Sequence, residues 1–156
     1  MSEVRITQEG PGWIAAVQTL VGPGRVAVVW QPCLDRVWQF LKANPAVKPG
    51  LNVFLYHHPP ADGQPFQACF GVQVAADFVG RDGVDCVQMP TGLAASLTLR
   101  GPYDGIPSGH ARVRDWAQAE GHFLGPASWE VYGHWHPDPR QLETRIVYLL
   151  ARGRRS

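Results

Sequence analysis

The sequence contains an internal repeat, and this feature constrains the fold more than any other. The segment GWIAAVQTLVGP (12–23) aligns with TGLAASLTLRGP (91–102) at an offset of 79 residues, with matched alanines, threonines and Gly-Pro pairs. Segment 34–56 aligns with segment 110–132 at an offset of 76 residues, and both copies end in tyrosine. Because the matches keep their order and nearly their spacing, we interpret the chain as two copies of one folding unit.

Each half, about 12–76 and 84–150, is predicted to fold as a strand, a helix and two further strands. The helices are expected at about 32–43 and 107–120, where apolar residues recur at helical spacing. One half alone cannot cover its apolar strand face, so residues 1–156 are expected to form one α+β domain with an antiparallel sheet and both helices on one face. The strands that follow the helices are expected at about 51–58, 66–76, 128–135 and 144–150.

The composition argues against several classes of function. Fourteen basic and 13 acidic residues leave a net charge of +1, so we expect no direct contact with nucleic acid. Cys33, Cys69 and Cys86 are far apart and form no CxxC motif, which favours a reducing compartment over a disulfide framework or a zinc site. No apolar stretch approaches the roughly 20 residues of a membrane helix, and the N-terminus does not resemble a signal peptide. We therefore expect a cytoplasmic protein without membrane contact.

Alternation along the predicted strands gathers unusual side chains on one face of the sheet. Glu130, Tyr132 and His134 share a face, and the repeat makes Phe54, Tyr56 and His58 their counterparts in the first half. We expect these side chains to lie close to where the two halves of the sheet join. The other face is expected to pack against the helices and carries Val53, Leu55, Trp129 and Val131.

Glu130 is the candidate centre of a functional site because it is a lone acid among aromatic residues. Such a carboxylate can pair with a cationic ligand, or act as a general acid or base if burial raises its pKa. Aromatic faces attract flat or cationic ligands by about 0.5–2 kcal/mol for each contact. The pattern indicates a small-molecule site. A solvated glutamate on an exposed strand is the alternative, and the sequence leaves it open.

Three segments of the second half resemble the gyrase-inhibitor-like (GyrI-like) small-molecule-binding family: RGPYDGIP (100–107), GPASWEVYGHW (125–135) and LETRIVYLL (142–150). VWQFLKAN (37–44) and NVFLYHH (52–58) fit the same pattern in the first half. This family is similar to the effector-binding domains of multidrug-responsive bacterial transcription activators. The resemblance implies a duplicated strand-helix-strand-strand unit with a pseudo-twofold groove, and ligands that are amphipathic and often cationic.

The resemblance also assigns residues and functions. Carried over by position, the groove glutamate is Glu130, with Tyr132 beside it and Tyr103 at the groove edge. The first hypothesis is a stand-alone protein that senses or sequesters a hydrophobic, aromatic or cationic small molecule. The second is a hydrolase of strained, cyclopropane-bearing compounds, in which Glu130 and Tyr132 would be catalytic. The third is a protein inhibitor of DNA gyrase, with gyrase or a regulator as partner. The candidate ligand-binding residues are Glu130, Tyr132, Tyr103, Phe54, Tyr56, Trp38 and Tyr148.

Several residues keep two interpretations. Trp38 could reach the groove edge or pack in the core, and the face of Tyr148 is open. His134 and His136 form an HxH pattern, but no acidic or cysteine ligand stands at a recognisable spacing, so we expect no metal site. No cofactor is expected. Cys69 lies in an apolar strand without an adjacent histidine and is expected to be an inert core residue.

Overall fold

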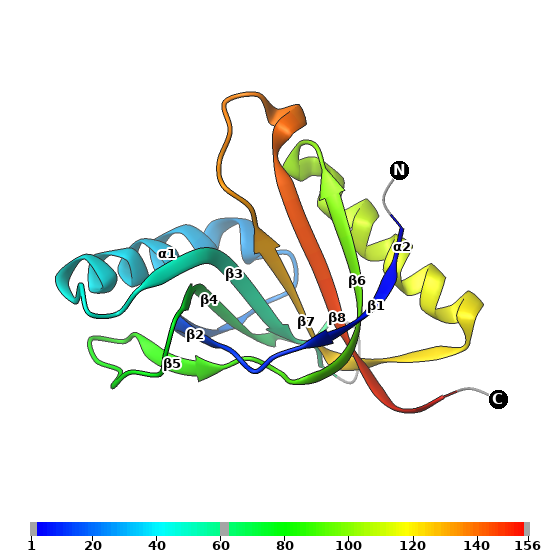
Figure 1. The fold of residues 1–156 in the computed structure, drawn as a ribbon, viewed down its shortest axis with the longest axis horizontal. Helices are drawn as coiled ribbons and strands as arrows, with labels where there is room; N and C mark the ends of the chain where they lie inside the picture. The colour runs from blue at the N-terminus through cyan, green and yellow to red at the C-terminus, as the bar shows by residue number, and fades with distance from the viewer. Residues whose placement is uncertain (1–2, 60–62, 155–156) are drawn as a thin grey trace.

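The computed structural model describes residues 3–59 and 63–154 of the protein, which form one antiparallel sheet and two α-helices (Figure 1). The first half contains β2 (Trp13–Val21), α1 (Val26–Ala43), β3 (Pro49–His57) and β4 (Phe66–Val74). The second half contains β6 (Gly92–Arg100), α2 (Ile106–Glu120), β7 (His122–Tyr132) and β8 (Glu143–Arg154). The remaining elements are β1 (Arg5–Glu9), β5 (Asp85–Gln88) and the 3-10 turns η1 (Tyr103–Gly105) and η2 (Pro139–Gln141).

The eight strands follow the order β1-β6-β8-β7-β3-β4-β2-β5, so β3 and β7 join the two halves at the centre of the sheet. In this antiparallel pair Phe54 lies directly opposite Glu130. The same two residues are equivalent in the repeat at an offset of 76. A residue pair that is both opposite and equivalent marks the symmetry axis, so the pseudo-twofold axis passes between Phe54 and Glu130.

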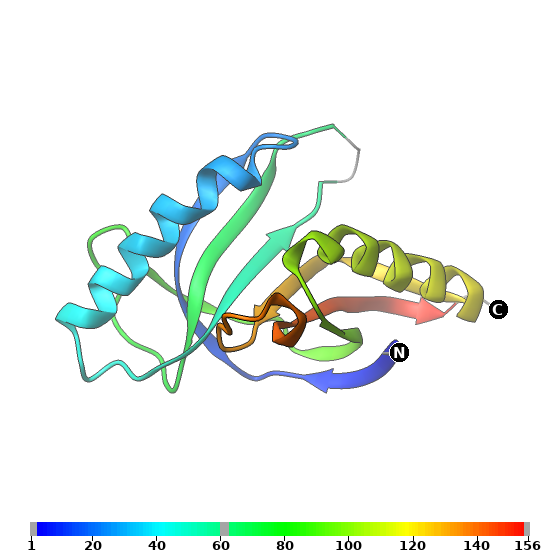
Figure 2. The same ribbon diagram turned by 90° about the horizontal axis from the view of Figure 1, so that it is seen from above.

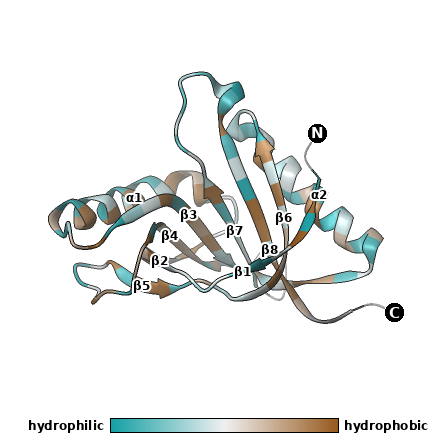
Figure 3. Ribbon diagram, viewed as in Figure 1, coloured by the Kyte–Doolittle hydropathy of each residue, from teal (hydrophilic) through white to brown (hydrophobic). Residues whose placement is uncertain are grey.

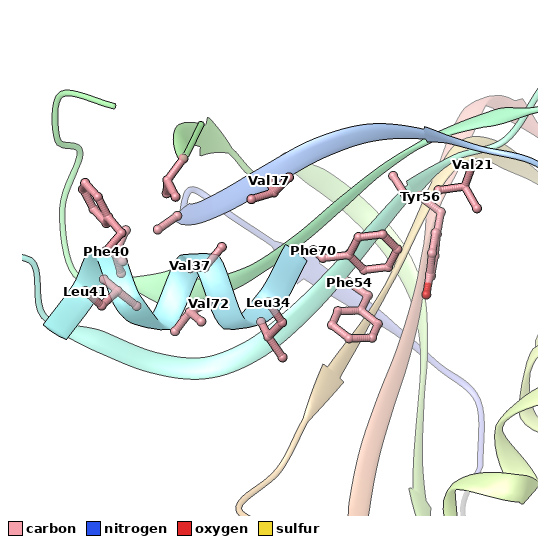
Figure 4. Close-up of a cluster of buried hydrophobic side chains, with 14 residues drawn as sticks. Val17, Val21, Leu34, Val37, Phe40, Leu41, Phe54, Tyr56, Phe70 and Val72 are labelled. Carbon is pink, nitrogen blue, oxygen red and sulfur yellow. The ribbon is translucent and has the colours of Figure 1, made fainter. Parts of the chain in front are cut away.

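Both helices cover the same face of the sheet, which confirms the predicted fold class. Phe54 lies opposite Glu130, Glu130 opposite Ile146, and Ile146 opposite Leu97, so these four side chains share one face. On that face α1 packs around Phe54, and Val113 of α2 packs with Leu97 and Ile146. The two helices diverge from a region near the centre of the molecule, where each begins (Figure 2). The α1 residues in the core are Leu34, Val37, Phe40 and Leu41 (Figure 4).

The prediction of which face the helices cover is wrong. Val53, Leu55, Trp129 and Val131 belong to a second buried cluster that contains no helix residue, and the helices lie on the side of Glu130. The physical reason is the curvature of the sheet. Twist accumulates over many strands and folds a large sheet toward itself. The cluster on this face accordingly joins residues from strands far apart in the order, such as Ile14 of β2 and Ala94 of β6.

Two element boundaries also differ from the prediction. Helix α1 begins at Val26 rather than near Pro32, so Pro32 lies inside the helix. The proline is tolerated because it sits on an exposed position, and the carbonyl that loses its donor belongs to Val28, which is also exposed. Strand β7 begins earlier, at His122, and ends at Tyr132. His134 therefore lies beyond the strand and does not continue the face of Glu130.

The segment between β7 and β8 is hydrophilic, whereas apolar residues concentrate along the central strands (Figure 3). Gly121 ends α2 as expected, with a left-handed backbone at φ 75°. Across residues 3–59 and 63–154, neither helix is long and apolar enough to cross a lipid bilayer.

Candidate functional site

A cavity of about 420 Å³ lies between the beginnings of α1 and α2, above the central strands. Val26 is the first residue of α1 and Ile106 the first of α2, and both line this cavity. Its volume lies within the range of roughly 300–1,000 Å³ typical of small-molecule sites. The lining residues are Val26, Tyr56, His58, Phe66, Ile106, Pro107, His110, Arg114, Glu130 and Tyr148.

Glu130 is 6% exposed and is held by three hydrogen-bond partners. Its Oε1 accepts from the hydroxyl of Tyr56 at 3.3 Å and from that of Tyr132 at 2.5 Å, and its Oε2 lies 2.6 Å from Nε2 of His110. Tyr56 and Tyr132 are counterparts in the repeat, so equivalent residues of both halves hold one carboxylate oxygen on the axis. Burial first, and then the negative charge of Glu130, raises the pKa of both phenols far above the ordinary value.

His110 connects Glu130 to Tyr148. An ionised carboxylate only accepts hydrogen bonds, so Nε2 of His110 donates to it. Nδ1 of His110 lies 2.7 Å from the Tyr148 hydroxyl, and the oxygen of this hydroxyl accepts a hydrogen bond from Nη1 of Arg114 at 3.3 Å. Burial raises the pKa of Tyr148, and the Arg114 charge opposes this shift. Arg114, Tyr148, His110 and Glu130 therefore form one continuous hydrogen-bonded chain along the cavity wall.

His58 lies beside Tyr148 on the cavity wall. Its Nε2 lies 2.5 Å from Oγ of Ser128, and its ring stacks on Tyr148 with centroids 6.0 Å apart and planes 5° from parallel. Burial lowers the pKa of His58, and the positive potential of His110 and Arg114 lowers it further. His58 is therefore neutral at pH values near 7.

The other candidate residues take three different positions. Phe54 is buried in the core with its ring centroid 4.9 Å from that of Tyr132, and it supports that phenol rather than lining the cavity. Tyr103 is 41% exposed, its ring meets that of Tyr132 edge-on with centroids 5.7 Å apart, and it does not line the cavity. Trp38 is 39% exposed, donates to Oδ1 of Asn52 at 2.9 Å and does not line the cavity.

The structure thus brings Glu130, Tyr56, Tyr132 and Tyr148 together, sets Phe54 beneath them and leaves Trp38 outside. Three residues near the cavity were missed: His110, Arg114 and Ser128. His58 was predicted on the face of Tyr56 and Glu130 but was not among the candidate ligand-binding residues. His110 and Arg114 are four residues apart on one helix face, and that spacing was the available signal. The repeat could not supply it, because His110 aligns with Leu34.

A metal centre finds no support in the described part of the chain, where no three His, Cys, Asp or Glu side chains gather closely enough to hold an ion. His134 and His136 lie in the exposed segment after β7, and Nδ1 of His136 accepts from the backbone N–H of Asp138 at 2.9 Å. Cys69 is buried, and burial raises the pKa of its thiol to about 11.

Solved structures with the same fold include the EcmrR C-terminal domain, at a TM-score of 0.80 and 15% identity over 98% of this chain and 99% of that one. SAV2435 bound to tetraphenylphosphonium is similar at a TM-score of 0.72 and 13% identity, over 96% of this chain and 94% of that one. A hydrolase encoded by lin2189 of Listeria innocua is similar at a TM-score of 0.61 and 13% identity, over 96% of this chain and 92% of that one. At these identities the likeness shows the fold alone.

A search of the curated proteins found no match. The sequence itself matches one family over residues 2–150, nearly its whole length. The duplicated α+β architecture and the cavity between the two helices agree with that match. The chain belongs to the GyrI-like family of small molecule binding domains.

Proposed function

We propose that this chain binds a hydrophobic molecule with an aromatic or cationic part in the cavity between α1 and α2, and that it senses or sequesters this molecule. The observation that carries the proposal is the buried carboxylate of Glu130 on the wall of a 420 Å³ cavity. A buried charge is costly to maintain unless it is compensated, and here a ligand cation can add to the three donors already present. Val26, Phe66 and Ile106 supply apolar contact surface.

The test is calorimetric titration with lipophilic compounds of matched size, both cationic and neutral, including tetraphenylphosphonium, the ligand of SAV2435. We expect at least one compound to bind with a Kd well below about 1 mM. Glu130→Gln keeps the size of the side chain, and Tyr56 and Tyr132 can still donate to its amide oxygen. The substitution should weaken the binding of cationic compounds about tenfold or more and that of neutral compounds much less. The proposal fails if no compound of either charge class binds.

A hydrolase is the second candidate, and the arrangement around Glu130 favours it. The carboxylate has a histidine on one oxygen and two phenols on the other, and such a group can accept a proton from water while a phenol orients an electrophile. In this candidate Glu130 is the general base and Tyr132 the positioning group. The fold similarity to the lin2189 hydrolase is compatible with this reading.

Mass spectrometry of a cyclopropane-bearing alkylating compound, incubated with stoichiometric protein, tests the hydrolase candidate. We expect a product with one added water from the native chain and none from Glu130→Gln. An unchanged compound argues against hydrolysis and leaves the binding proposal intact. The gyrase-inhibitor hypothesis concerns the protein surface rather than this cavity and stays a prediction for a supercoiling assay, in which Glu130→Gln should behave like the native chain.

A further inference from the structure

Three ionisable side chains of the cavity come from the second half and have apolar counterparts in the first, and this asymmetry bears on the charge of the ligand. At the repeat offset of 76, His110 replaces Leu34, Arg114 replaces Trp38 and Tyr148 replaces Val72. At these three positions the second half contributes ionisable side chains and the first half apolar ones, whereas the polar cavity residues of the first half are Tyr56 and His58. The apolar cavity residues include Val26 and Phe66 of the first half.

Glu130 does not dominate the charge of this cavity. The lining residues include one carboxylate, Glu130, and one guanidinium, Arg114, together with His58 and His110. The formal charges of Glu130 and Arg114 cancel, so a purely cationic ligand gains attraction at one end of the wall and meets repulsion at the other. A site built only to select cations would not place Arg114 there.

Arg114 has N–H groups that could donate to a ligand. The hydrogen bond from its Nη1 to the Tyr148 hydroxyl, at 3.3 Å, is long and goes to a neutral oxygen. Within residues 3–59 and 63–154, the ion pairs join Arg100 to Glu143, His110 to Glu130, Arg140 to Asp138 and Arg145 to Glu9, and none includes Arg114. A guanidinium presents several N–H groups in a planar fork that fits a carboxylate with two parallel hydrogen bonds.

We propose that the ligand is amphoteric: it carries a basic group toward Glu130, an acidic group toward Arg114, and an apolar body against Val26 and Phe66. The inference rests on the proposed binding function and adds the acidic group to it. His110 and Tyr148 lie between the two charged side chains. The basic and acidic groups of the ligand must therefore be on different parts of the molecule. Arg114 is then the residue that distinguishes an amphoteric ligand from a simple lipophilic cation.

The test uses two N-benzylquinolinium ions that differ at a single group. One carries a carboxylate on the benzyl ring and is a zwitterion, and the other carries its methyl ester and is a cation. Titration calorimetry should show the zwitterion binding the native chain about tenfold more tightly than the ester. Arg114→Met should remove this preference by weakening the zwitterion while leaving or improving the ester. Arg114→Lys, which keeps the charge but not the planar fork, should retain part of it.

Arg81→Met is the matched control, because Arg81 is an exposed arginine in the turn before β5, on another part of the fold. It should keep the native preference. A circular dichroism melt of each variant establishes that it is folded. Equal affinity of the two compounds for the native chain, or a preference that survives Arg114→Met, overturns the amphoteric assignment while binding itself stands. If neither these compounds nor the broader panel bind, the proposed binding function fails as well.

Discussion

The phenols around Glu130 predict that the protein loses stability steeply at alkaline pH. Burial and the neighbouring charge raise the pKa of Tyr56 and Tyr132, and both donate to the carboxylate. A group whose pKa is raised on folding contributes stability that is complete below its unfolded pKa and is lost as the pH rises through the folded value. For tyrosine the unfolded value is near 10, so the loss begins there.

The magnitude follows from proton linkage. At about pH 11 an unfolded tyrosine is ionised while a buried one still holds its proton, and this difference costs about 1.4 kcal/mol for each phenol relative to pH 9. Tyr56 and Tyr132 together should therefore lower the free energy of unfolding by about 3 kcal/mol. Tyr148 shifts in the same direction and adds to the loss.

Urea denaturation followed by circular dichroism at about pH 9, 10 and 11 measures this effect. Tyr132→Phe removes one titrating phenol, so its loss of stability between pH 9 and pH 11 should be smaller than that of the native chain by about 1.4 kcal/mol. Lysines and cysteines contribute equally to both proteins and cancel in the comparison. A native stability that is flat over this range, or an identical slope in Tyr132→Phe, would refute the reasoning.

Three further predictions concern individual residues. Gly71→Ala should destabilise the fold by about 1–3 kcal/mol in urea titration, because the added Cβ would overlap the carbonyl of Ala15 and lie 2.8 Å from the Cβ of Ala16. Cys69 should react with a thiol reagent at neutral pH only as fast as the protein unfolds, since its thiol is buried with a pKa of about 11; rapid labelling in the native state would contradict this. The pKa of His58 is lower in the folded than in the unfolded protein, so stability should fall as the pH drops below the unfolded pKa of about 6.5. In acid titration His58→Gln should show a smaller loss of stability than the native chain.

The repeat was sufficient to predict the fold class and the central position of Glu130. The repeat placed Glu130 near the line between the two halves, and the observed strand register adds that Phe54 and Glu130 lie opposite each other on the pseudo-twofold axis. The helix-bearing face was not predictable in the same way. The central residues of β3 and β7 are buried on both faces, and the choice between the faces depends on the curvature of the whole sheet, which is a property of the assembled strands.

The polar part of the site was the harder part to predict. His110 reaches Glu130 only because α2 folds back over β7, and no local pattern marks that contact. Tyr148 was named as a candidate with its face undecided, and pairing with Ser128 puts it on the cavity side. Trp38 lies outside the cavity because α1 turns its indole toward Asn52, an interaction between exposed side chains that the alignment with Arg114 does not reveal.

The position of Glu130 on the symmetry axis limits how the two copies can diverge. Restoring identity by Phe54→Glu would set two carboxylates face to face on neighbouring strands, at the distance of a direct cross-strand pair, where like charges repel. In a matched pair one of the two carboxyl groups would have to keep its proton, so a duplicated fold of this kind holds a full negative charge on its axis most easily when only one copy supplies the acid.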